Sequence, residues 1–61
     1  MSDDETLRRL RHDLRSPLTV VMGFAELMAS DRPMTDEQRR EYSERVLDAA
    51  VDMRDLIDDA K

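Results

Sequence analysis

Two helical stripes of apolar residues, separated by a break that contains a proline, limit what this chain can fold into. In the first stripe, apolar residues recur every seven positions from Leu7 to Met28. Leu18 and Ala25 form a second row beside them. This spacing places all of these side chains on one face of a helix, as in a coiled coil. The sequence therefore predicts a helix over residues 3–29.

The break between the two stripes lies at residues 30–34. Pro33 cannot donate a backbone hydrogen bond, and its ring biases Arg32 away from the helical conformation. Thr35 and Gln38 follow with the spacing of a capping box, in which each side chain bonds to the backbone N–H of the other residue. A second helix is therefore expected to begin directly after Thr35.

The second stripe is centred on Val46 and predicts a helix over residues 36–60. The face opposite this stripe is acidic, and we expect it to be a solvated surface. The other apolar members of the stripe are Tyr42, Ala50, Met53, Ile57 and Ala60, with Ala49 and Leu56 on its margin.

The small size of the chain favours self-association. It has 61 residues and no cysteine, and its single histidine has no second histidine or cysteine to join it in a metal site. A core of this size supplies only about 3–5 kcal/mol. Two antiparallel hairpins packed face to face would bury both stripes. We therefore expect an all-α fold, an antiparallel helical hairpin that homodimerises into a four-helix bundle.

The charge of the chain disfavours two classes of partner. Its formal net charge of -5 disfavours non-specific nucleic-acid binding, which needs Lys and Arg to neutralise phosphates. It also disfavours docking to an anionic membrane surface. No apolar run approaches the roughly 20 residues of a membrane span, and no signal peptide is visible. We expect a cytoplasmic location, no nucleic-acid partner and no membrane segment in this chain.

The only histidine lies in the most unusual stretch, residues 11–18. His12 is followed at once by Asp13, four residues later by Ser16 and then by Pro17. Residues four apart share a helix face, so His12 and Ser16 are expected side by side. A proline in a helix interior costs about 3 kcal/mol or more. The combination indicates a site rather than a packed core.

A row of candidate residues lies on the outer face of the first helix, about 140° to 180° from the apolar stripe at 100° per residue. Gly23, the only glycine, costs about 1 kcal/mol relative to alanine in a helix interior. Core packing does not explain a glycine on this face, so we expect another backbone to approach it closely. The row consists of His12, Ser16, Thr19 and Gly23, with Val20 and Leu27 as an apolar margin.

These residues resemble a known motif. Residues 11–19 (RHDLRSPLT) followed by residues 23–27 (GFAEL) resemble the H-box of sensor histidine kinases. Nearly the whole chain resembles the dimerisation and histidine-phosphotransfer domain of that family. The resemblance implies a helical hairpin that dimerises into a four-helix bundle and accepts a phosphoryl group.

The resemblance also implies a role for each residue of the motif. His12 is the phospho-accepting nucleophile, and Asp13 orients the imidazole and takes its proton. Ser16 occupies the position where many members carry threonine or asparagine, used to place water for dephosphorylation. Pro17 matches the helix-bending proline of the family. A response-regulator receiver domain is expected to dock along the outer face, at Arg15, Thr19, Val20, Gly23 and Leu27.

The side chains are suited to this chemistry irrespective of the family. Imidazole titrates near neutral pH, so a large share is neutral and nucleophilic at pH 7. A carboxylate that accepts the proton of one ring nitrogen leaves the other nitrogen free to attack. Phosphoryl transfer depends mainly on positioning and charge stabilisation. Arg11 and Arg15 are candidates for holding a phosphate near His12.

The groups that would bind ATP are missing from the sequence. The family's ATP-binding domain carries glycine-rich boxes and a metal-binding asparagine, whereas this chain has one glycine, no asparagine and no Walker-type loop. ATP and Mg²⁺ are therefore expected on a separate domain, and no cofactor on this chain. Residues 1–61 would form a dimerisation and phospho-acceptor domain. This domain would be incomplete as an enzyme on its own. It would be either a part of a kinase or a free-standing module.

Two functions remain open from the sequence. In the first, the chain is the phospho-acceptor and dimerisation domain of a two-component sensor histidine kinase, with a second copy, an ATP-binding domain and a receiver domain as partners. In the second, it is a structural dimerisation module with a vestigial H-box. A third interpretation, an acidic helical adaptor, leaves Pro17 unexplained. Phosphate uptake at His12 would separate the first two functions.

Overall fold

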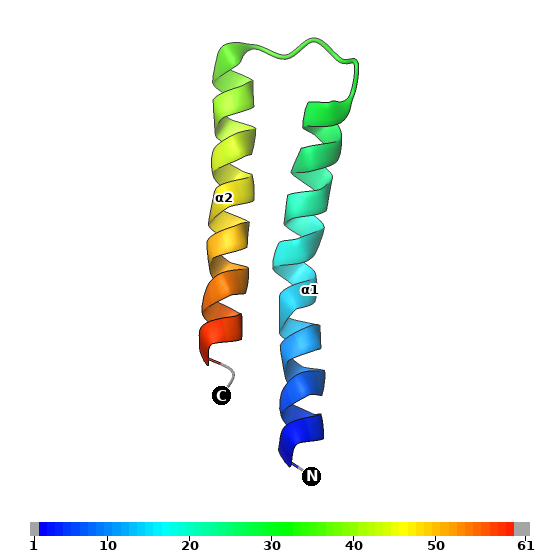
Figure 1. The fold of residues 1–61 in the computed structure, drawn as a ribbon. Helices are drawn as coiled ribbons and strands as arrows, with labels where there is room; N and C mark the ends of the chain where they lie inside the picture. Colours follow the sequence, from blue (N-terminus) through cyan, green and yellow to red (C-terminus); the bar gives the residue numbers. More distant parts are fainter. Residues whose placement is uncertain (1, 60–61) are drawn as a thin grey trace.

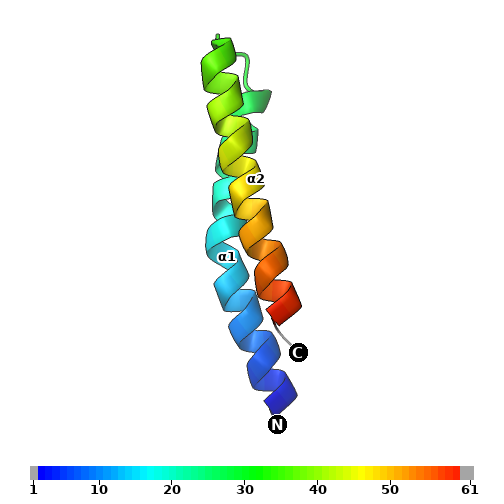
Figure 2. The same ribbon diagram turned by 90° about the vertical axis from the view of Figure 1, so that its left-hand side faces the viewer.

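The computed structural model describes residues 2–59, with side chains from residue 4 onward. It contains two helices, α1 (Ser2–Ala29) and α2 (Asp36–Asp59), which lie antiparallel and side by side (Figures 1 and 2). No strand occurs within these described residues. The predicted antiparallel helical hairpin is therefore confirmed.

The helix bounds differ little from the ranges that the sequence predicts. Helix α1 begins at Ser2, one residue before the predicted start, and ends at Ala29 as expected. Helix α2 begins at Asp36 as expected, and its described part ends at Asp59. The predicted last residue of this helix, residue 60, lies outside the described residues.

The contact between the helices uses one side of each apolar stripe. On α1 the half-buried side chains include Leu14, Val21 and Phe24. The ring of Phe24 meets that of Tyr42 on α2, with centroids 5.4 Å apart and planes tilted by 38°. Offset and tilted aromatic pairs of this kind add about 0.5–1.5 kcal/mol beyond their buried area. The half of the hairpin nearest the connection is held in this way.

The centre of the second stripe differs from the prediction. Ala49, expected on the margin, is the only described residue that is buried, at 5% exposure. Ala50 and Ile57, expected near the centre, are exposed. The reason is that the stripe serves two surfaces, and only its Ala49 edge meets α1. Periodicity alone identifies every apolar residue of α2 and does not separate those that face α1 from those that face solvent. The centre of the predicted stripe therefore lies between these two directions.

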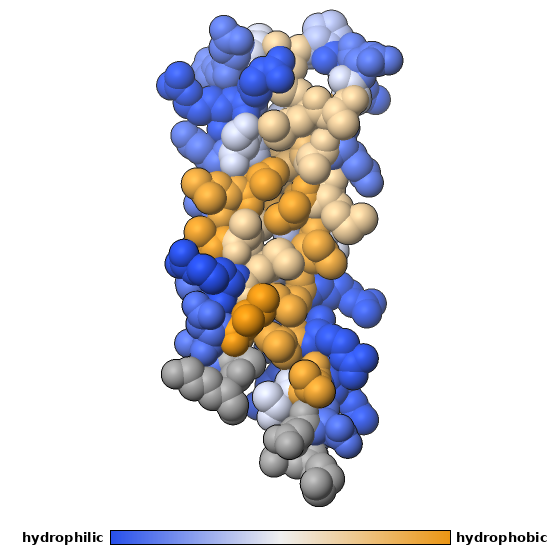
Figure 3. Space-filling model, in the orientation of Figure 1, coloured by the Kyte–Doolittle hydropathy of each residue, from blue (hydrophilic) through white to orange (hydrophobic). Residues whose placement is uncertain are grey.

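A continuous apolar surface remains exposed along both helices (Figure 3). By helical periodicity Leu7, Leu18 and Met22 of α1 lie on the same side of the hairpin as Ile57 of α2. All four side chains are large and exposed. We call these four residues the apolar face. Val20 and Leu27, also exposed, lie toward the other side of α1.

The start of α2 is fixed by the predicted capping box. The backbone N–H of Gln38 donates to Oγ1 of Thr35 at 3.0 Å, and the backbone N–H of Thr35 donates to Oε1 of Gln38 at 3.0 Å. The N–H of Arg39 donates to the carbonyl of Thr35 at 2.9 Å, which starts the helical ladder. This prediction is confirmed, because the reciprocal bonds satisfy two backbone donors that the helix itself leaves without a partner.

Replacing the capping residue should destabilise the hairpin. Thr35→Ala removes one of the two reciprocal bonds and is expected to lower the free energy of unfolding by about 1 kcal/mol. For a domain of this size that corresponds to a fall in Tm of about 4–8 °C. The matched control is Ser43→Ala, which removes an exposed hydroxyl from the interior of α2, where alanine is the better helix former. Equal Tm values for the two variants at the same protein concentration would contradict the role of the cap.

Candidate functional site

His12 projects from the outer face of α1. Its side chain is 87% exposed, so the ring has no packing role within the hairpin. Its position in the third turn of a 28-residue helix fixes the backbone beneath it. The predicted direction of His12, toward solvent or a partner, is confirmed. An imidazole held in this way can reach a reacting group that another protein surface brings to it.

Asp13 lies against one nitrogen of the ring. Nδ1 of His12 and Oδ1 of Asp13 are 3.4 Å apart, at the long limit of a hydrogen bond. Adjacent helical residues point about 100° apart, so the carboxylate approaches the ring from its flank. A proton on Nδ1 fits this contact, because the carboxylate can only accept. The lone pair of a neutral ring would then lie on Nε2, the nitrogen farther from Asp13 and open to attack an electrophile.

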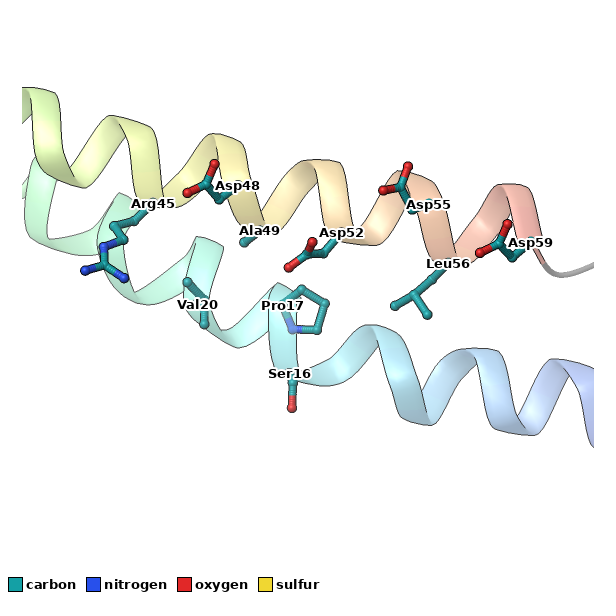
Figure 4. A pocket seen from close by; sticks show the side chains of 10 residues that line it. All are labelled: Ser16, Pro17, Val20, Arg45, Asp48, Ala49, Asp52, Asp55, Leu56 and Asp59. Carbon is teal, nitrogen blue, oxygen red and sulfur yellow. The ribbon is translucent and has the colours of Figure 1, made fainter.

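The two hydroxyls near His12 differ in their bonding. Oγ1 of Thr19 donates to the backbone carbonyl of Arg15 at 2.8 Å, so its hydrogen is engaged within the helix. The hydroxyl of Ser16 forms no hydrogen bond within the described part of the chain. Figure 4 shows the Ser16 side chain pointing away from α2. Of the two, Ser16 is therefore the hydroxyl that has its donor available.

A hollow beside His12 is lined by three further residues that the sequence did not single out. Its walls are His12, Glu5, Arg8 and Arg9, all of them on α1. Arg11 and Arg15, predicted from the sequence as phosphate-holding residues, do not line this hollow. The spacing of Arg8 and Arg9 in the sequence could have identified them. Arg8 and Arg9 precede His12 by four and three residues, and residues at these spacings lie on the same face of a helix.

A groove runs between the two helices on the side opposite the apolar face (Figure 4). Pro17 and Val20 of α1 and Ala49 and Leu56 of α2 give it an apolar lining, and Ser16 forms part of its rim. One wall is acidic and solvated, as predicted for this face of α2. The polar residues of the wall are Arg45, Asp48, Asp52, Asp55 and Asp59.

Gly23 lies on the exposed surface of α1. A Cβ atom added to it would meet nothing within 4 Å, and no glycine has a positive φ. Neither the packing of the hairpin nor the backbone conformation therefore requires glycine at this position.

Two kinds of site are absent from the part of the chain that the structure describes. It holds no group of three histidine, cysteine or acidic side chains arranged to bind a metal ion. Neither α1 nor α2 has an apolar segment long enough to cross a membrane, as far as their described residues extend.

Replacing the glycine should stabilise the hairpin. Gly23→Ala places a methyl group in open space and removes the cost of glycine in a helix interior. The expected gain in the free energy of unfolding is about 1 kcal/mol, measured by urea denaturation. Gly23→Ser, which adds a Cβ with a weaker helix former, should give a smaller gain. A loss of stability in both variants would show that a contact at Gly23 within the protein had been disturbed.

Comparison with known proteins finds a family match over nearly the whole chain. Residues 2–61 match the family model described as "His Kinase A (phospho-acceptor) domain". The chain is 48% identical over 33 residues to the sensor histidine kinase YcbM of Bacillus subtilis, an alignment that covers 54% of this chain and 11% of that protein. It is 40% identical over 40 residues to the cell-division control histidine kinase PdhS of Brucella ovis, covering 62% of this chain and 4% of that protein.

The chain thus spans only a small part of the length of these relatives. No solved structure matches it significantly. The family match covers nearly every residue, including the stretch around His12 that the hairpin exposes. The chain belongs to the His Kinase A (phospho-acceptor) domain family.

Proposed function

We propose that His12 accepts a phosphoryl group from ATP held by a separate catalytic domain and passes it to an aspartate of a response-regulator receiver domain. The observation that carries this proposal is the exposed ring of His12 with Nδ1 against Asp13, in a chain of the phospho-acceptor family. The relatives named above are histidine kinases, which supports a role within such an enzyme. The site of action would be the cytoplasm, where ATP is available.

The geometry suggests how the transfer would run. The lone pair on Nε2 of His12 attacks the γ-phosphorus of ATP, the bond from phosphorus to the bridging oxygen breaks, and ADP leaves with that electron pair. The ring would then carry a positive charge, which Asp13 relieves by taking the proton from Nδ1. In the second step Asp13 returns the proton to Nδ1 while a receiver carboxylate attacks phosphorus, and the electron pair of the P–N bond returns to Nε2, which restores the neutral imidazole. Ser16, with its donor available, would place the water that hydrolyses the phosphoryl group.

The apolar face supports a homodimer. Leu7, Leu18, Met22 and Ile57 form a surface that a lone hairpin leaves in water (Figure 3). A second copy packed on this face would bury the same residues on both chains and give a four-helix bundle. Because the apolar face and the ring of His12 lie on different sides of α1, dimerisation would leave His12 accessible.

The receiver would dock on the outer side of α1. Val20 and Leu27 offer exposed apolar contacts there, and Gly23 lets a partner backbone come close. Arg15 and Thr19 border the same surface. Pro17 would bend α1 beside this docking surface, as in the resemblance described above.

Replacing the histidine provides the primary test. The protein is mixed with ATP, Mg²⁺ and a histidine-kinase ATP-binding domain, and acid-labile, base-stable phosphate is measured. Wild type is expected to incorporate phosphate, and His12→Gln none, while circular dichroism shows the same helix content in both. A folded wild-type dimer that takes up no phosphate from several such domains would favour the structural module with a vestigial H-box.

A matched pair of substitutions tests the two surfaces of α1. Leu18 and Val20 are similarly exposed, at 43% and 41%, but lie on opposite sides of the helix. Leu18→Asp should convert the dimer to monomer, because it would bury a charge in an apolar interface. Val20→Asp should leave the dimer intact and slow phosphoryl transfer to the receiver. Sedimentation equilibrium measures the first effect, and equal dissociation by both variants would refute the assignment of the apolar face.

A further inference from the structure

We propose that Arg8 and Arg9, one turn before His12, form a cationic seat that holds the phosphoryl group on the phosphorylated histidine. This inference rests on the proposed function of His12 and adds two residues to its site. The motif around His12 begins after these arginines, and their role comes from their position in the structure. They are positioning residues, since they act on a group that His12 carries.

The placement of the two arginines follows from the helix. At 100° per residue Arg8 and Arg9 lie about 40° and 60° to either side of His12, one turn toward the N-terminus. Helical side chains also lean toward the N-terminus, so the ring of His12 leans over the turn that carries them. The three side chains line one hollow, together with Glu5. A group attached to Nε2 would therefore lie over the helical turn that carries both arginines.

The charges in the hollow favour a phosphoryl group. A phosphoryl group carries about −1.5 to −2 charges near pH 7 and offers three acceptor oxygens. Guanidinium forks match such oxygens in pairs, and their charge is permanent. Within the described residues neither Arg8 nor Arg9 forms an ion pair with a carboxylate. Both arginines are therefore available to bind an incoming anion.

Glu5 opposes the arginines in the same hollow. Its carboxylate lines the hollow but forms no ion pair within the described residues, so it adds a negative charge where the phosphoryl group would lie. Asp13 adds another on the far side of the ring. No residue of α2 lines the hollow. The proposal thus predicts opposite effects for neutralising the arginines and neutralising Glu5.

Hydrolysis of phosphohistidine provides the readout. In this reaction Nδ1 gains a proton, water adds to phosphorus, the P–N bond breaks, and its electron pair returns to Nε2 with release of inorganic phosphate. Positive charge beside the ring disfavours the added proton, and the same charge holds the phosphoryl dianion. Both effects slow hydrolysis. Removing the arginines should therefore shorten the lifetime of phospho-His12.

The experiment uses phosphoramidate to phosphorylate the 61-residue chain, because this donor needs no kinase and the chain has a single histidine. Loss of the phosphohistidine signal is followed by ³¹P NMR at pH 7 and low salt. Arg8→Gln and Arg9→Gln should each speed hydrolysis about threefold, and the double variant up to about tenfold, from a Coulomb estimate for exposed charges about 6 Å apart. Glu5→Gln should slow it. In 1 M salt these differences should shrink, since the Debye length falls to about 3 Å.

Arg40→Gln is the matched control, because it removes the same charge at the far end of the hairpin and should leave the rate unchanged. Equal hydrolysis rates for wild type and the double variant would contradict the proposal that Arg8 and Arg9 hold the phosphoryl group. So would a difference that persists in 1 M salt, or acceleration by Glu5→Gln. These results differ from a failure of the proposed function, which would appear as no uptake from ATP even where phosphoramidate labels His12.

Discussion

The packing of α1 against α2 along one edge of each apolar stripe is the constraint on which the rest of the structure depends. The small side chain of Ala49 is enclosed at this contact, and most other apolar residues there remain half-buried. A hairpin of two helices cannot surround its own core, so part of each stripe stays in contact with water. The exposed part of the stripes, the apolar face, is a direct result.

This constraint divides α1 into three surfaces with separate tasks. One surface holds α2, the second carries the apolar face, and the third presents His12 with Asp13 and the hollow lined by Arg8. Because the residues of the third surface all belong to α1, helical geometry alone sets their spacing. A 28-residue helix is stabilised mainly by packing of its apolar sides. The surface that packs against α2 and the apolar face therefore stabilise the helix that carries the site.

Features that depend on local helical geometry could be predicted from the sequence. The prediction was wrong where an apolar stripe faces both the neighbouring helix and solvent. The cap at Thr35 and the exposed position of His12 depend on spacing within a few residues, and both are confirmed. The buried position of Ala49 depends on where α1 lies, which the periodicity of α2 cannot reveal. Arg8 was missed for a different reason: arginines on exposed helix faces are common, and only the hollow beside His12 distinguishes it.

Pro17 has a mechanical consequence for the helix that carries the site. Helix α1 continues through Pro17, yet Pro17 has no N–H to give to the carbonyl of Asp13, and its ring crowds that carbonyl. The turn from Asp13 to Pro17 therefore lacks one helical hydrogen bond, and it begins directly after His12 in the chain. A torque or tilt applied at the N-terminal end of α1 would concentrate as bending at this turn. The angle of the imidazole relative to the apolar face could then change while the rest of the helix stayed rigid.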